Sequence, residues 1–262
     1  MEKDYDKIIA DYTQAIQQNP SDAEAYRNRA EAYSYKDDYK QAIADFTQAI
    51  QLDPSNANVY ENRGYAYSKN KDYDQAIADY THAMLLGIND AIIYSNRGGM
   101  YYYKRDYDQA IVDCTQAIKL DPNYVSAYNI RSCVHFMKND YDQTITDCNK
   151  AIQMDFNDTD AYFLRGYVYF IKNDYDLAIM DYNKAIQLSP NDANAYTNRG
   201  DAYYYKEDYD QAIADYNKAI QLNPNDVEVY DKRGLAYFLK KDYDNAIADY
   251  AQAIRLNPHE VE

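Results

Sequence analysis

The stretch Ala193–Asp226, ANAYTNRGDAYYYKEDYDQAIADYNKAIQLNPND, decides the fold of this chain. Near-copies of the same length follow one another without linkers and start at Ala23, Ala57, Ala91, Val125, Thr159, Ala193 and Val227. A half copy, residues 1–22, precedes them. Self-similarity at a fixed period of this size predicts an array of small stacked units, each too small to bury a core alone.

Each copy predicts two helices joined by a tight turn. Within the quoted copy, apolar and aromatic residues recur at three-to-four spacing in two runs, one containing Tyr196 and Tyr203 and one from Tyr209 to Leu222. Asp208 and Gln211 stand between the runs in the order of a capping box, which starts a helix. The same pair recurs at Asp38/Gln41, Asp72/Gln75, Asp106/Gln109 and Asp140/Gln143.

The prolines mark where the second helix of each copy ends, since the residue before a proline is disfavoured in helical angles. All six stand at this point: Pro20, Pro54, Pro122, Pro190, Pro224 and Pro258. The two remaining turns have Ile88 and Phe156 instead. Gly87 can end its helix by another route, because glycine tolerates positive φ.

This pattern resembles the tetratricopeptide repeat (TPR) family, W-x2-L-G-x2-Y…A-x3-F…P. The copy starting at Ala57 reads Tyr60-x2-Arg63-Gly64-x2-Tyr67…Ala76-x3-Tyr80. Tyrosine replaces the tryptophan of the pattern, and arginine replaces its leucine in every copy. The resemblance implies an all-α solenoid, a right-handed superhelix of antiparallel helix pairs whose first helices line the concave wall. We expect one domain array: a half repeat at 1–22 and seven repeats over 23–262.

An arginine column and an aspartate column accompany the repeats. The arginines are Arg29, Arg63, Arg97, Arg131, Arg165, Arg199 and Arg233, and the aspartates run from Asp11 to Asp249 with one in each second helix. We expect the two columns to pair, because an arginine stem covers apolar surface while its head stays bonded. The functional alternative is a ladder of free arginines that binds carboxylates.

Composition excludes several function classes. The formal charge of −16 disfavours nucleic acid and anionic lipid as partners. No apolar run reaches membrane-spanning length and no secretion signal opens the chain, so we expect a cytoplasmic protein without membrane insertion. Cys114 and Cys148 fall in the aromatic column and are expected to be buried. No catalytic, metal or phosphate-binding motif is present, so neither an enzyme nor a cofactor is expected.

One candidate binding feature is a column of asparagines on the first helices: Asn28, Asn62, Asn96 and Asn198. An asparagine side chain can both donate to and accept from a peptide backbone. The column is similar to the asparagine ladder of the O-linked N-acetylglucosamine transferases, which implies binding of an extended peptide. The alternative is a tolerated polar residue on a solvated face.

A second candidate is an apolar patch in the middle of the chain. In the first helix of the copy starting at Thr159, five residues replace residues that are mostly polar in other copies: Phe163, Leu164, Tyr167, Phe170 and Ile171. The preceding copy adds a further set, Ile130, Cys133, Phe136 and Met137. A helix that is apolar on every face is buried on every face or binds something. We expect a protein or peptide partner here; sequence drift or pairing between copies of the chain are the alternatives.

The family's clamp for acidic chaperone tails requires lysines and asparagines on the first helices that no copy supplies, so we expect it to be absent. The function expected is therefore a protein-interaction scaffold that binds a peptide or helix on the concave surface. Self-association through the ends, with Tyr250 and Leu256 as candidate exposed residues, is an alternative. A regulatory TPR fragment of a larger enzyme is another.

Overall fold

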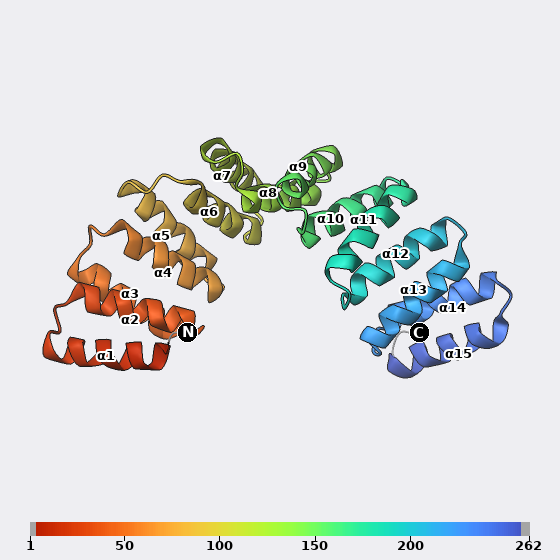
Figure 1. The fold of residues 1–262 in the computed structure, drawn as a ribbon, viewed down its shortest axis with the longest axis horizontal. Helices are drawn as coiled ribbons and strands as arrows, with labels where there is room; N and C mark the ends of the chain where they lie inside the picture. The colour runs from red at the N-terminus through yellow and green to blue at the C-terminus, as the bar shows by residue number, and fades with distance from the viewer. Residues whose placement is uncertain (1–3, 258–262) are drawn as a thin grey trace. The chain divides into compact units, whose positions relative to one another are not determined.

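The computed structural model describes residues 4–257, and in that range it is built from helices and turns without a strand (Figure 1). Pro258 and the residues that follow it lie outside the described range. The helices are α1 Tyr5–Gln18, α2 Ala23–Tyr35, α3 Tyr39–Leu52, α4 Ala57–Lys69, α5 Tyr73–Leu85, α6 Ala91–Tyr103, α7 Tyr107–Leu120, α8 Val125–Met137, α9 Tyr141–Met154, α10 Thr159–Ile171, α11 Tyr175–Leu188, α12 Ala193–Tyr205, α13 Tyr209–Leu222, α14 Val227–Leu239 and α15 Tyr243–Leu256. The predicted two helices per repeat are confirmed.

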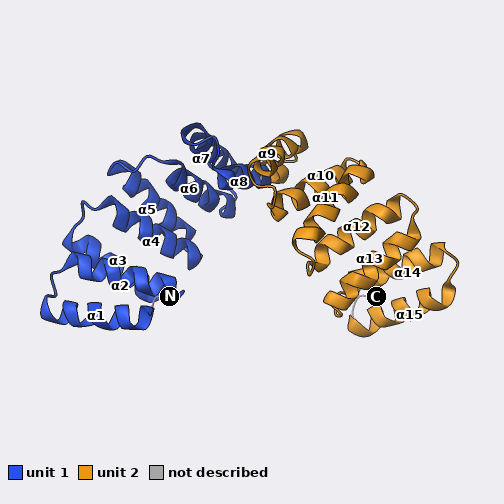
Figure 2. Ribbon diagram, viewed as in Figure 1, with its two compact units in different colours: residues 1–134 blue, residues 135–262 orange. Residues whose placement is uncertain are grey.

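The chain separates into two compact units, residues 1–134 and residues 135–262 (Figure 2). Unit 1 contains α1 to α7 and most of α8; unit 2 contains the end of α8 and α9 to α15. Within each unit, consecutive helices pack against each other, from α1 to α7 in unit 1 and from α9 to α15 in unit 2. The single array over residues 23–262 stays a prediction.

The second helices start at aspartate caps, as the sequence predicts. The Asp38 side chain accepts a hydrogen bond from the backbone N–H of Gln41 at 3.3 Å, and Asp208 accepts one from Gln211 at 3.2 Å. The residue before each cap has a left-handed φ, for example 59° at Asp37. This residue reverses the chain between two antiparallel helices, and the cap then satisfies a helix N–H that has no partner inside the helix.

The second helices end by the two routes expected. The helix α3 ends at Leu52, two residues before Pro54. Where proline is missing, α5 ends at Leu85 and Gly87 adopts a φ of 111°. Glycine occupies this angle without the steric cost that a side chain would add.

The core of each repeat is a row of large residues facing small ones. Phe46, Tyr80, Tyr182 and Tyr216 are at most 1% exposed, and Cys114 and Cys148 are fully buried in the same column, as predicted. The small residue on the first helix lies against this column. A Cβ atom added at Gly200 would lie only 2.7 Å from Cε1 of Tyr216. Glycine at this position therefore lets the two helices approach closely.

The arginine and aspartate columns pair, which confirms that prediction. Arg97 Nε donates to Asp113 Oδ2 at 2.7 Å and its Nη2 to Asp113 Oδ1 at 2.8 Å. The hydrogen bond to Asp113 raises the pKa of Arg97. The third donor, Nη1, reaches back to Thr81 of the preceding repeat at 3.0 Å. The same bidentate pair occurs at Arg29/Asp45, Arg63/Asp79, Arg165/Asp181, Arg199/Asp215 and Arg233/Asp249.

These arginines are structural. Each described pair fixes the two helices of one repeat, and the donor that reaches back fixes the register with the repeat before it. The carboxylates are buried, for example Asp113 at 2% exposure, so a free arginine ladder does not form in these pairs.

Candidate functional site

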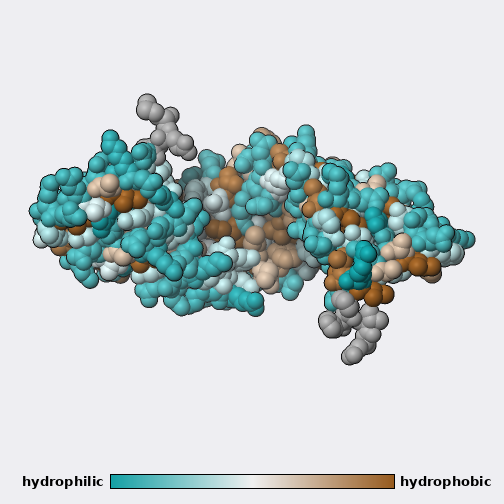
Figure 3. Space-filling view, turned by 90° about the horizontal axis from the view of Figure 1, so that it is seen from below, coloured by the Kyte–Doolittle hydropathy of each residue, from teal (hydrophilic) through white to brown (hydrophobic). Residues whose placement is uncertain are grey.

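The surface available for binding is set by the first helices. In unit 1, α2 contacts α4 and α4 contacts α6; in unit 2, α10 contacts α12 and α12 contacts α14. Every residue of the two candidate features belongs to a first helix. The face visible in Figure 3 is mostly hydrophilic and carries several separate hydrophobic areas.

The asparagine column is partly occupied by bonds within the chain. The Asn28 side-chain oxygen accepts from Arg27 at 3.1 Å, and the Asn62 amide donates to Glu31 Oε1 at 3.2 Å. The Asn198 amide donates to the Asn194 carbonyl of its own helix at 2.8 Å. A peptide backbone would have to share or replace these bonds, so peptide binding by this column stays a prediction.

The apolar candidates divide between the two units. Ile130 and Cys133 belong to unit 1, where both are half-buried. The others belong to unit 2. Met137 is 46% exposed and Ile171 is 36% exposed, whereas the other five are half-buried: Phe136, Phe163, Leu164, Tyr167 and Phe170. The patch as a whole therefore stays a prediction, and the candidates of each unit are described by themselves.

The rings of Phe163 and Phe170 take part in packing within unit 2. Phe163 packs edge-on against Tyr182, with ring centroids 5.8 Å apart. Phe170 lies 5.7 Å from Tyr175 and 5.5 Å from Tyr205 by the same measure. Both rings pack against the buried cluster of Ala178, Ile179, Tyr182 and Ala202. The two phenylalanine rings therefore fill space at the interface between repeats and also present apolar surface.

A cavity of about 240 Å³ lies beside Phe170 in unit 2. Its walls come from α10, α12, α13 and α14, and its lining residues are Phe170, Asp201, Tyr204, Tyr205, Tyr216, Lys232 and Leu235. Leu235 is 41% exposed, so the cavity opens onto an apolar rim. The sequence did not reveal Tyr204, Tyr205 or Leu235 as candidates, because tyrosine is common throughout this chain and a leucine in one copy only forms no repeating pattern.

The polar end of this cavity is a compact network. Lys232 Nζ lies 2.8 Å from Asp201 Oδ2 and 2.7 Å from Glu228 Oε1. The Tyr216 hydroxyl donates to Asp201 Oδ1 at 2.8 Å. Burial raises the pKa of Asp201, and Lys232 opposes that rise. The network satisfies both oxygens of a half-buried carboxylate, so the apolar rim is the part available to a ligand.

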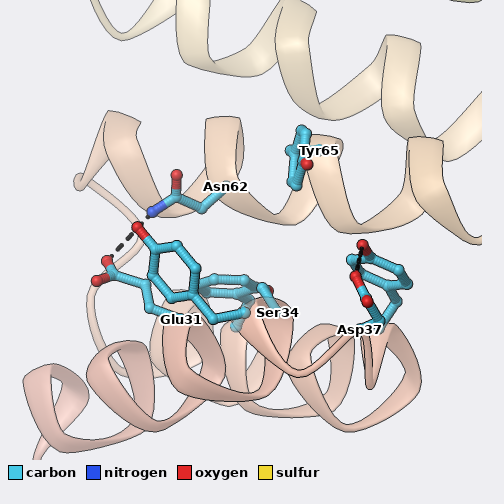
Figure 4. Close-up of a pocket in the computed structure, with 8 residues that line it drawn as sticks. Glu31, Ser34, Asp37, Asn62 and Tyr65 are labelled. Atoms are coloured by element: carbon cyan, nitrogen blue, oxygen red, sulfur yellow. Dashed lines mark hydrogen bonds between the residues drawn. The ribbon is translucent and has the colours of Figure 1, made fainter. Parts of the chain in front are cut away.

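A larger cavity, of about 560 Å³, lies in unit 1 between α2, α3 and α4 (Figure 4). It is lined by Glu31, Ser34, Tyr35, Asp37, Tyr39, Phe46, Asn62 and Tyr65. Figure 4 shows the Glu31 carboxylate and the Asn62 amide joined by a hydrogen bond at one side of it. Sequence reasoning selected only Asn62 here. The signal it missed is the spacing of 31 residues that joins Glu31 to Asn62 and also Asp201 to Lys232.

Two kinds of site are absent from residues 4–257. In that range no group of three or more His, Cys, Asp or Glu side chains could hold a metal ion. No helix there has the length and apolar character needed to cross a bilayer. His135 is half-buried and packed between two acids: its Nδ1 lies 3.9 Å from Asp140 Oδ2, and its Nε2 lies 3.9 Å from Asp147 Oδ2.

Comparison with family models decides the family. Models described as tetratricopeptide repeat match residues 23–56, 46–78, 91–124 and 232–260, and a model described as TPR repeat matches residues 166–206 and 200–241. The chain belongs to the tetratricopeptide repeat family. The TPR matches fall on the helix pairs described above, in both units. A comparison with curated protein sequences gives no match.

Solved TPR structures have the same fold. The crystal structure of MamA protein is 27% identical and has a TM-score of 0.61, with 65% of this chain and 93% of that chain covered. YrrB, described as a TPR protein with an unusual peptide-binding site, is 23% identical over 68% of this chain and 92% of its own, with a TM-score of 0.56. The C-terminal part of a TPR protein from Cytophaga hutchinsonii is 20% identical over 88% and 95%, with a TM-score of 0.72.

Proposed function

We propose that this TPR protein is a protein-interaction scaffold that binds an apolar segment of a partner peptide or helix on the first helices of unit 2. The observation that carries the proposal is the apolar rim of the unit 2 cavity. Leu235 and Tyr205 are 41% and 58% exposed there, and Phe238 on the same helix as Leu235 is 51% exposed. Exposed apolar clusters with a polar surround are typical of interaction sites.

The energetics support a weak to moderate site. Fully burying one large apolar side chain is worth about 1.5–3 kcal/mol, and the rim offers several that are already half-buried. Association itself costs about 4–15 kcal/mol. Contacts with three or four rim side chains supply about 5–12 kcal/mol, so they reach a micromolar complex, with a binding free energy of about −8 kcal/mol, only when the cost of association is near its lower end.

Known TPR structures support a binding role for the fold. YrrB carries a peptide-binding site according to its description, and its likeness to this chain lies in the fold. The asparagine column adds a backbone-binding element if its amides exchange their present partners. Regulation of a larger enzyme and self-association remain alternatives to the scaffold. For self-association, Tyr250 and Leu256 are half-buried, whereas Tyr243, Ile247 and Ile254 of α15 are more than half exposed.

The test is peptide selection against the full chain followed by measurement of affinity. Peptides selected from a defined synthetic library are titrated by fluorescence polarisation into the parent chain and into Leu235→Asp. Leu235 is the rim residue to change, because Phe163 and Phe170 also pack in the core. We expect affinity to fall by about 10- to 150-fold, the equivalent of one buried leucine.

The matched control is Leu85→Asp, which introduces the same residue at a site that is 79% exposed at the end of α5 in unit 1. Circular dichroism should give the parent's helicity for both variants. Equal affinity of the selected peptides for parent and Leu235→Asp would refute binding at the rim. An equal loss in the Leu85→Asp control would refute it too.

A further inference from the structure

On the first helices of unit 2, one carboxylate binds a cation that belongs to the chain itself. In the repeat starting at Ala193, Asp201 receives the ammonium of Lys232, which stands 31 residues further along the chain, at 2.8 Å. The other carboxylate oxygen receives the Tyr216 hydroxyl at 2.8 Å. Three side chains from three helices thus form a closed polar network in which the cation is the chain's own.

The corresponding place in the repeat starting at Ala23 has the acid without this cation. Glu31 aligns with Asp201, Asn62 with Lys232, and Phe46 with Tyr216. The Asn62 amide donates to Glu31 Oε1 at 3.2 Å, and Arg27 lies 4.0 Å from the same oxygen. Among residues 4–257, nothing bonds to Oε2 of Glu31, and the Phe46 ring has no hydroxyl to offer.

A cavity replaces the missing groups. It measures about 560 Å³, against about 240 Å³ at the repeat that holds its own lysine. Tyr35 and Tyr65 line it and are 69% and 43% exposed. Aromatic faces and carboxylates together favour an ammonium or guanidinium group. The Lys69 ammonium lies 5.3 Å from the Tyr65 ring centroid, so the chain itself provides one example of a cation next to this ring.

We propose that the unit 1 cavity binds a lysine or arginine side chain of a partner peptide, with Glu31 as the anion and the tyrosines as its aromatic walls. The proposal rests on the proposed scaffold function and adds the charge of one partner side chain. It agrees with the formal net charge of −16, which attracts basic segments. A lysine stem also suits a cavity whose floor is the Phe46 ring.

The experiment uses the full chain and three acetylated, amidated pentapeptides that differ only in the central residue: lysine, arginine or the neutral norleucine. Binding is followed by shifts of backbone amide signals in NMR titrations, read at α2 and α4. We expect the two cationic peptides to shift signals around Glu31 and Asn62, with affinity falling as salt rises. Equal binding of the norleucine peptide, or no binding by any of the three, would overturn the proposal.

Two variants test the mechanism. Asn62→Lys supplies the chain's own cation as in the repeat starting at Ala193, so it should abolish peptide binding while keeping the fold. Glu31→Gln should weaken binding about tenfold, the effect of removing one charge-assisted hydrogen bond. The control Asp160→Asn removes the same charge at an exposed position of unit 2 and should bind as the parent does.

The outcome is separable from that of the scaffold test. The Leu235→Asp variant should keep its response to the cationic peptides, because Leu235 belongs to the other unit. Peptides that bind through Leu235 but ignore Glu31→Gln and Asn62→Lys would leave the scaffold standing and refute the cation site alone.

Discussion

Gly200→Ala and Gly99→Ala are the same chemical change in the middle of two first helices. The structure predicts that the first lowers the stability of the fold and that the second raises it. A Cβ atom at Gly200 would lie 2.7 Å from Cε1 and 3.0 Å from Cδ1 of Tyr216. A Cβ atom at Gly99 would meet nothing nearer than Cδ1 of Ile130 at 3.5 Å, an ordinary contact. The pair therefore separates helix propensity from packing.

The magnitudes follow from two terms. Replacing a mid-helix glycine by alanine stabilises the helix by about 0.8–1 kcal/mol at either site. Overpacking opposes this at Gly200 by about 1–3 kcal/mol. The Tyr216 ring cannot easily move away, because it is at most 1% exposed and its hydroxyl is bonded to Asp201. We expect Gly200→Ala to destabilise the chain by about 1 kcal/mol and Gly99→Ala to stabilise it by about the same amount.

The assay is thermal unfolding followed by circular dichroism, with urea unfolding as a second measure. A difference of about 2 kcal/mol between the two variants corresponds to about 4–8 °C in Tm for a chain of this size. The repeat starting at Ala23 has an alanine, Ala30, at the position of Gly200. Ala30 lies in the same buried cluster as Phe46, a ring without a hydroxyl. Adding Tyr216→Phe should therefore recover part of the loss in Gly200→Ala. A Gly200→Ala protein that melts at or above the Gly99→Ala protein would refute the reasoning.

Two further predictions concern charged groups. Arg97→Met leaves the carboxylate of Asp113, 2% exposed, without its bidentate partner and should cost about 3–5 kcal/mol in urea unfolding. Lys172→Met at an exposed ion pair should leave the urea midpoint nearly unchanged, and equal effects of the two variants would contradict the structural role of the arginine column. The hydrogen bond to Asp37 raises the pKa of Tyr39 to about 12, so the stabilisation from this bond should be complete below pH 10, where the unfolded phenol begins to ionise, and lost as the pH rises through 12. Asp37→Asn should bring the titration of the Tyr39 ζ-carbon signal in NMR back toward pH 10, and an unchanged titration would exclude the hydrogen bond as the cause.

The candidate site could be predicted only in part. The first helices follow from periodicity, and the structure confirms them. The apolar residues of the middle repeats were selected from the sequence alone, and their role in binding stays a prediction. The sequence marked Phe163 and Phe170 as candidates for partner binding, but their rings also fill space between repeats. A ring of that size reaches the neighbouring repeat, and its contacts depend on distances between helices that the aligned repeat sequences do not contain.

The sequence by itself determined the repeat length, the start and end of nearly every helix, the buried columns and the pairing of an arginine column with an aspartate column. These features are local in the sequence or recur once per repeat, so the same pattern can be read in several copies. Only the tertiary structure decided which side chains meet across neighbouring repeats. Within residues 4–257, one oxygen of Glu31 has no bonding partner beside its cavity, whereas both oxygens of Asp201 are bonded. Residues 31 positions apart are brought together only by the stacking of one first helix on the next.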